Sequence, residues 1–371
     1  MTQSECKFFI PGPTWVRPEI LQEMTRPMIG HRSSEFKALF RRIVTDLHEL
    51  FVTRAAVFVA TCSGTGVMEA ALENCVPRRV LVTTCGAFSE RWYKIAQTLG
   101  LEADRLEEPW GQAIDPLRLA DHLASRRAHY DAVTLTHNET STGITNDVQT
   151  LARIIHDESP GTLILVDAVS SLAGIPVSFD DWGLDVCLAS VQKGIALPPG
   201  ITVFAVSDAA LDAAGKRKYR GTYFDFLEYK KQAEDDAVPS TPSIPHFHAL
   251  ARQLDDILRK ETLAARFERH RAMRDLTIER TAGYATVAGD REHASPTVTA
   301  LRPVTGSAED VRSAMKARGY TLGAGYGEWK ETTFRIGHMG DITIEAVSGM
   351  LDVLDELCHP ERSEGSPSQE P

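Results

Sequence analysis

Over its first two-thirds the chain alternates short, β-branched apolar runs with longer segments of helical periodicity. Six of these runs are predicted to be strands: residues 56–60, 80–84, 132–136, 163–167, 186–190 and 201–206. Continuous apolar runs of this length, separated by helices, are typical of parallel strands that are buried on both faces of a sheet. The alternation therefore predicts an α/β fold with a large, doubly wound, mostly parallel sheet, whose ligands bind at the carboxyl ends of the strands.

Helical and α+β patterns define the rest of the chain. A helix is predicted over residues 34–51, where apolar side chains recur every three or four positions, and one long helix over 247–274, after a proline-rich break at 239–245. Shorter strands and helices are predicted at 297–301, 308–318, 333–336 and 344–357. We expect an N-terminal arm (1–15), a large domain (16–258), a smaller α+β domain (259–358) and a disordered tail (359–371).

Composition excludes several classes of protein. The formal net charge of −11 argues against a nucleic-acid-binding protein, because such proteins concentrate Lys and Arg on one face. No segment approaches the roughly 18 consecutive apolar residues of a membrane span, and the N-terminus lacks the basic and apolar regions of a signal peptide. The six cysteines form no CxxC pair, so we expect no metal site and a cytoplasmic protein with reduced thiols.

Two motifs in the predicted sheet domain can bind charged groups. Ser63-Gly64-Thr65-Gly66 lies between a strand and a helix, where backbone N–H groups can hold an anion; the alternative, which is the commoner use of such a loop, is a plain tight turn. Asp167 ends a buried strand, in the region where α/β sheets bind ligands; the alternative is a helix N-cap.

Two further motifs carry cations. Lys193 follows another buried strand, and desolvation there would lower its pKa, as a nucleophilic lysine requires, whereas most lysines are solvated. Arg335 lies inside a short apolar strand, where its guanidinium needs a carboxylate or phosphate partner or a structural salt bridge. An anion site, a strand-end Asp, a strand-end Lys and an Arg in the smaller domain together are the parts of a pyridoxal-phosphate enzyme.

This combination resembles the class V aminotransferases of pyridoxal-phosphate fold type I, above all the alanine–glyoxylate and serine–pyruvate aminotransferases. The resemblance spans roughly residues 8–357. The matching segments are Pro11–Thr14, Gly30–Arg32, Ser63–Gly66, Gly86–Arg91, Thr136–Gly143, Val166–Ser171, Gln192–Lys193 and Phe334–Gly337.

The resemblance implies pyridoxal 5′-phosphate as cofactor and a role for each motif. Lys193 would hold the cofactor as a Schiff base and move a proton, Asp167 would pair with the pyridine nitrogen, and Arg335 would bind the substrate α-carboxylate. The other implied cofactor contacts are Ser63, Gly64, Thr65, Gly66 and Gln192 at the phosphate, Phe88 and Thr140 at the ring, and Thr241 across the interface of a homodimer. Phe88 stands where the family often has Trp, and Val238 stands where a Tyr is common.

We expect an aminotransferase that moves an amino group from a small amino acid, such as alanine or serine, to a 2-oxo acid such as glyoxylate or pyruvate. A lyase such as a cysteine desulfurase is weakened because the only late cysteine, Cys358, ends the terminal helix. A phosphoserine aminotransferase stays possible, since Arg32 could take a substrate phosphate. A non-catalytic regulator on this scaffold would not need Lys193, Asp167 and Arg335 together.

Overall fold

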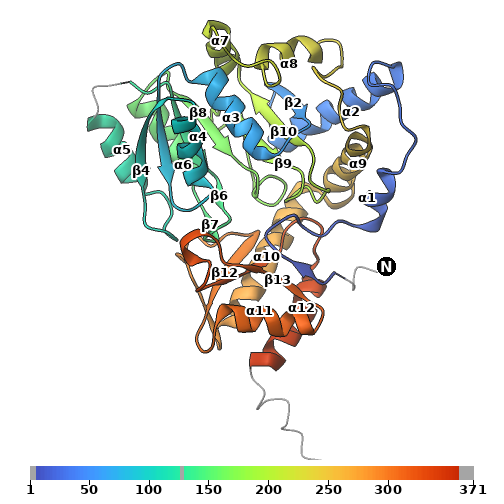
Figure 1. Ribbon diagram of the computed structural model, residues 1–371, viewed down its shortest axis with the longest axis vertical. Coiled ribbons are helices and arrows are strands. Elements are labelled where there is room, and N and C mark those ends of the chain that lie inside the picture. The colour runs from blue at the N-terminus through green and yellow to red at the C-terminus, as the bar shows by residue number, and fades with distance from the viewer. Residues whose placement is uncertain (1–5, 126–128, 359–371) are drawn as a thin grey trace, which may run out of the picture.

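The computed structural model describes residues 6–125 and 129–358 and contains two main sheets (Figure 1). The larger sheet has seven strands in the order β2-β10-β9-β8-β5-β3-β4. Its strands are β2 (Ala56–Ala60), β3 (Arg79–Thr84), β4 (Glu102–Glu107), β5 (Ala132–Thr136), β8 (Leu163–Asp167), β9 (Val186–Ser190) and β10 (Thr202–Val206). Neighbouring strands are parallel, except that β10 runs antiparallel to both β2 and β9.

Helices cover both faces of this sheet because its central strands are apolar on both sides. In β8, Ile164 and Val166 join the core beneath one set of helices, whereas Leu163 and Leu165 join the core beneath the other. The first set is α2 (Ser34–Phe51), α5 (Pro116–Ser125), α6 (Val148–Glu158) and α9 (Ile244–Asp255). The second set is α3 (Gly64–Cys75), α4 (Ser89–Thr98), α7 (Asp208–Lys216) and α8 (Phe226–Ala233).

The smaller sheet combines the C-terminal part of the chain with one strand from the N-terminus (Figure 1). Its order is β1 (Phe8–Phe9), β13 (Thr321–Ala324), β14 (Phe334–Gly337), β12 (Val298–Pro303) and β11 (Ala285–Val287). Strand β1 runs parallel to β13, with Phe8 opposite Thr321. The helices of this part are α10 (Leu263–Thr281), α11 (Ala308–Ala317) and α12 (Ile344–Cys358). The short helix α1 (Pro18–Glu23) and the hairpin β6 (Asn138–Glu139) and β7 (Ile144–Thr145) complete the connections.

The predicted fold class is confirmed, and most predicted elements lie where expected. Four of the six predicted strands and the helix over 34–51 have the predicted bounds, and the other two strands differ by one residue. The four later elements each begin and end within two residues of the prediction. No helix in the described part of the chain is long and apolar enough to cross a membrane.

The single long helix predicted over 247–274 is wrong. Helix α9 ends at Asp255, the π-helix η2 (Asp256–Glu261) follows, and α10 begins only after Thr262. Thr262 has a φ of 74°, which interrupts the helical path, and its hydroxyl accepts a hydrogen bond from the Ala265 N–H. The expected tail lies outside the described residues, and the domain boundaries stay a prediction.

A buried ion network ties the two parts of the molecule together. Arg266 of α10 is only 2% exposed and donates to Asp341 at 3.0 Å and to the Gly194 carbonyl at 2.8 Å. Arg17, which precedes α1, donates to the same aspartate at 2.6 Å. Although burial opposes ionisation, the two guanidinium groups hold the pKa of Asp341 below its ordinary value. The network fixes the backbone immediately beside Lys193.

Replacing Arg266 with leucine is expected to lower the free energy of unfolding by about 3 kcal/mol or more, because buried carbonyls and a buried carboxylate lose their donor. The matched control is Arg271→Leu in the same helix, whose pair with Glu268 is exposed and worth at most about 1 kcal/mol. Urea unfolding of both variants measures the difference. Equal losses in the two variants would contradict a special role for the buried network.

Candidate active site

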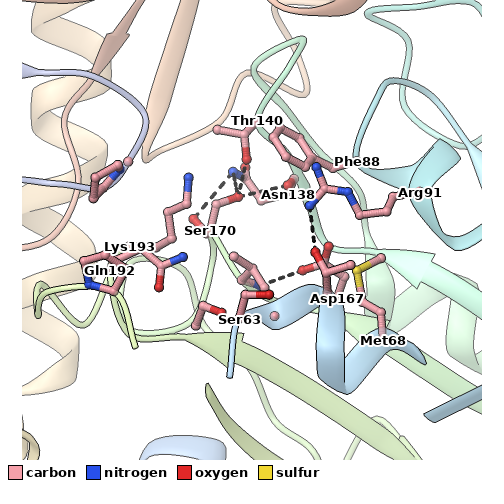
Figure 2. A pocket seen from close by; sticks show the side chains of 17 residues that line it. Ser63, Met68, Phe88, Arg91, Asn138, Thr140, Asp167, Ser170, Gln192 and Lys193 are labelled. Atoms are coloured by element: carbon pink, nitrogen blue, oxygen red, sulfur yellow. Dashed lines mark hydrogen bonds between the residues drawn. The ribbon is translucent and has the colours of Figure 1, made fainter. Parts of the chain in front are cut away.

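One cavity of about 290 Å³ lies at the carboxyl ends of β8 and β9. Eight of the residues predicted for the site line it: Ser63, Gly64, Thr65, Phe88, Thr140, Asp167, Gln192 and Lys193. Figure 2 shows Lys193 and Asp167 entering this cavity from the ends of neighbouring strands. Gly66, Thr241 and Arg335 are not among its lining residues. The structure thus brings together most of the predicted set from five segments of the chain.

Lys193 is half-buried beneath the N-terminal arm. Its ammonium donates to the Pro11 carbonyl, and Gly12 lies directly over it with a φ of 112°. A Cβ at Gly12 would stand 2.4 Å from the Lys193 Nζ, so only glycine fits there. Burial, assisted by the nearby Arg335, lowers the pKa of Lys193 to about 8. A substantial fraction of this amine is therefore neutral and nucleophilic near pH 8.

Asp167 is the acidic counterpart on the adjacent strand. Its Oδ1 accepts a hydrogen bond of 2.8 Å from the Val169 N–H, within a turn that follows β8. The alternative of a helix N-cap is wrong, because turns and not a helix follow this residue. Burial raises the pKa of Asp167 to about 6, against the lowering effect of Arg91 and Lys193. A cationic partner inside the cavity would lower the pKa of this carboxyl group again.

The Ser63–Gly66 segment begins helix α3 and leaves its positive end available. Ser63 is the N-cap residue, yet its side chain makes no capping hydrogen bond, and the first turn contains no acidic residue. Helix N-termini bind anions through their free N–H groups and the helix dipole. Because Ser63, Gly64 and Thr65 all line the cavity, an anionic group inside it meets this helix end.

Arg335 lies just behind the cavity, on β14 of the smaller sheet. Its guanidinium donates to the Ala324 carbonyl at 2.7 Å and to the Thr140 carbonyl at 2.9 Å. Burial lowers the pKa of Arg335 to about 10. Within the described residues its hydrogen-bond partners are carbonyl oxygens and not carboxylates, so a structural salt bridge does not explain this arginine. A carboxylate ligand would supply the missing countercharge.

Glu139 is a site residue to which sequence reasoning assigned no role. Its buried carboxylate accepts hydrogen bonds from the Phe88 N–H at 3.1 Å and from the Ser89 N–H at 2.8 Å. It also accepts from the Ser141 hydroxyl. A buried carboxylate needs several hydrogen-bond donors. Two of the donors here are backbone N–H groups at the start of α4, so Glu139 fixes the backbone of Phe88. In the sequence, a glutamate within a threonine-rich segment was the feature that could have indicated this role.

Arg91 and Asn138 also line the cavity without having been predicted (Figure 2). Arg91 donates to the Thr65 hydroxyl at 3.0 Å, and its guanidinium lies 4.9 Å from the centre of the Phe88 ring. The spacing of three residues from Phe88 places both on one side of α4 and was the signal for Arg91. Asn138 donates to the Ser170 hydroxyl at 2.8 Å.

These groups fit pyridoxal phosphate. The aldehyde of that cofactor needs a neutral amine, its pyridine nitrogen a carboxylate, its phosphate an anion site and its ring an apolar face. The cavity offers Lys193, Asp167, the start of α3 and Phe88 for these four needs. The fold and the cavity together define a pyridoxal-phosphate-dependent enzyme of fold type I.

The comparisons with known proteins place the chain more narrowly. The model of the class V aminotransferases matches residues 20–327, and the chain belongs to this family. It is 34% identical to a serine–glyoxylate aminotransferase of Methylorubrum extorquens, over 92% of this chain and 88% of that protein. A Synechococcus relative named soluble hydrogenase, small subunit, is 36% identical over 98% of this chain and 97% of its own.

A solved structure agrees with the sequence relatives. The alanine–glyoxylate aminotransferase of a Nostoc species is 27% identical and superposes with a TM-score of 0.88, covering 95% of this chain and 94% of its own. The family resemblance inferred from the motifs is therefore confirmed, and the enzyme is a pyridoxal-phosphate-dependent transaminase.

Asp167→Asn is expected to stabilise the cofactor-free protein in a pH-dependent way. The folded pKa of Asp167, about 6, exceeds the unfolded value, so the wild type loses stability from this group as the pH rises from about 4 to about 6. The asparagine lacks this penalty. The gain should approach about 3 kcal/mol at pH 8 and be about half of that at pH 5. Urea unfolding at both pH values measures it, and a gain independent of pH would contradict the assignment.

Proposed function

We propose that this transaminase moves the amino group of a small amino acid, alanine or serine, to glyoxylate or pyruvate. The observation that carries the proposal is the joint placement of Lys193, Asp167 and the start of α3 in one cavity, with Arg335 behind it. At about 290 Å³ the cavity lies at the low end of the usual range for ligand pockets, which favours small substrates beside the cofactor. The names of the serine–glyoxylate and alanine–glyoxylate relatives support the same substrates.

Each residue has a distinct task in this proposal. Bound pyridoxal phosphate supplies an electron sink for negative charge at the substrate α-carbon. Lys193 takes a proton from that carbon and returns it, for which an amine with a pKa near the working pH is suited. Asp167 holds the positive charge at the pyridine nitrogen, and Arg335 binds the substrate carboxylate. Gln192 and the Ser63–Gly66 segment hold the phosphate.

The alternative functions receive less support from the geometry. Cys358 lies at the end of α12, and no cysteine lines the cavity within the described part of the chain, as a desulfurase nucleophile would. Within one chain Arg32 lies in a different hollow, beside Thr241, so a phosphoserine aminotransferase would need Arg32 from the partner chain. The hydrogenase name belongs to one relative, whereas the cavity of this chain provides the groups that a transaminase needs.

The test is a panel of donors and acceptors given to the purified enzyme, with half-reactions followed by the absorbance of the bound cofactor. The half-reactions of alanine and serine as donors, and of glyoxylate and pyruvate as acceptors, should be the fastest. Lys193→Ala should lower turnover by at least about a hundredfold, because it removes the group that moves the proton. Lys7→Ala, an exposed lysine on the same arm, is the matched control. Preference for phosphoserine, or release of sulfide from cysteine, would contradict the proposal.

We further propose a homodimer in which Thr241 reaches the cofactor phosphate of the partner chain. Thr241 lies in a hollow of about 410 Å³ with His31 and Arg32, outside the cofactor cavity of its own chain. Large apolar side chains are exposed elsewhere on the large part of the molecule, with Tyr219 at 74% and Met28 at 68%. Aromatic residues and methionine are enriched at protein–protein interfaces.

Sedimentation equilibrium should give twice the mass of the chain. Thr241→Ala should keep that mass but weaken cofactor binding by roughly tenfold to a hundredfold, the effect of losing one hydrogen bond to a charged group. Thr98→Ala at the exposed end of α4 provides the matched control. A monomer, or an unchanged cofactor affinity in Thr241→Ala, would contradict this arrangement.

A further inference from the structure

The loop at 325–333 joins β13 to β14 and crosses from the smaller sheet to the large part of the molecule. It is closed at its base, because the Gly325 N–H donates to the Thr333 carbonyl at 2.9 Å. The Thr333 hydroxyl donates to the Trp329 carbonyl, also at 2.9 Å. Because Arg335 follows within two residues on β14, the shape of this loop bears directly on the position of its guanidinium.

Tyr326 in this loop contacts two residues of the site at once. Its ring stacks on Phe88, with the centres 5.2 Å apart and the planes 21° from parallel. The Arg335 guanidinium lies 5.5 Å from the centre of the same tyrosine ring. Phe88 belongs to the large part and Arg335 to the small sheet, so Tyr326 links the cofactor-facing ring to the predicted carboxylate-binding group.

A second aromatic contact fixes the other end of the loop. Trp329 packs edge-on against Trp110 of the large part, with the ring centres 6.1 Å apart. Gly327, between the two aromatic residues, has a φ of 53°, and a Cβ there would lie 2.2 Å from the Trp110 ring. The loop is thus clamped to the large part on both sides of Gly327, and Tyr326 has little freedom to leave Phe88.

Arg335 needs such a contact because its hydrogen bonds restrain only part of its guanidinium. They run to two backbone carbonyls, one in β13 and one at Thr140. The tyrosine ring presents its electron-rich face to the cation, an attraction that strengthens when water is excluded. The ring also limits movement of the guanidinium toward the open side, where Tyr326 itself is 40% exposed.

We propose that Tyr326 is a positioning residue for carboxylate recognition. Its ring holds the Arg335 guanidinium at a fixed position relative to Phe88, so that every carboxylate substrate binds in one orientation. The inference rests on the proposed role of Arg335. It implies an effect on the binding of amino donor and oxo-acid acceptor alike, because both carry the same carboxylate. It implies little effect on the proton transfer at Lys193.

Two variants of the holoenzyme test the ring separately from the hydroxyl. Tyr326→Leu removes the aromatic face and keeps much of the volume, whereas Tyr326→Phe keeps the face. Tyr326→Leu should raise the dissociation constant of propionate, a carboxylate without an amino group, about tenfold in calorimetry. The KM values of donor and acceptor should rise by a similar factor, while kcat stays within about twofold. Tyr326→Phe should stay within about twofold of the wild type in all of these.

Tyr320→Leu is the matched control. Tyr320 also lies in the smaller part, packs on Phe9 with centres 6.2 Å apart and has the Lys7 ammonium 5.6 Å from its ring, but it does not contact Arg335. It should leave propionate binding and both KM values unchanged. Unchanged propionate binding in Tyr326→Leu, an equal effect in Tyr326→Phe, or an equal effect in Tyr320→Leu would each overturn the proposal.

Propionate binding also separates this inference from the proposed function. If the enzyme used other substrates than those proposed, calorimetry would still report the change at Arg335, and the role of Tyr326 would stand. If transamination of alanine and serine were found while propionate binding and KM ignored the tyrosine, the function would stand and the role of Tyr326 would fall.

Discussion

The burial of Lys193 at the end of β9 is the constraint on which the rest of the structure depends. The N-terminal arm lies over the amine: the Pro11 carbonyl accepts a hydrogen bond from it, and Gly12 leaves room for Nζ. That arm is held in turn by β1, which pairs with β13 of the smaller sheet. Arg266 fixes the next backbone carbonyl, at Gly194. The N-terminal arm, the contact between the two parts of the molecule and the position of the Lys193 amine therefore depend on one another.

Charge in the cavity is arranged differently from charge on the chain as a whole. The protein carries a formal −11, yet Lys193, Arg91 and Arg335 gather around the cavity. Desolvation shifts the pKa of Lys193 down to about 8 and that of Asp167 up to about 6, so both groups titrate near neutrality. Burial disfavours the charged forms of both Lys193 and Asp167, and a cofactor with an anionic phosphate and a basic ring nitrogen offsets this cost for both groups. The same burial that destabilises the empty site thus favours loading.

The sequence predicted the sheet well and the site partly, for physical reasons that differ. Strands such as 163–167 are apolar on both faces and appear in the sequence as an unbroken apolar run. The edge strand β4 (EADRLE) is charged and has no such run, so it was not predicted. The positive φ of Thr262, which divides the predicted long helix, has no marker in the sequence. Glu139 and Tyr326 both contact Phe88, which lies far away along the chain, and neither contact can be inferred from the neighbouring sequence.

Those contacts explain how a phenylalanine can serve where the family often has tryptophan. Phe88 lacks the indole N–H and the larger surface, so its ring needs other restraints. Glu139 fixes its backbone N–H, Arg91 lies against its ring, and Tyr326 stacks on it from the smaller sheet. The Tyr326 ring also lies against the Arg335 guanidinium, so it joins Phe88 to the smaller sheet. Phe88 is therefore linked through Tyr326 to the sheet that carries Arg335.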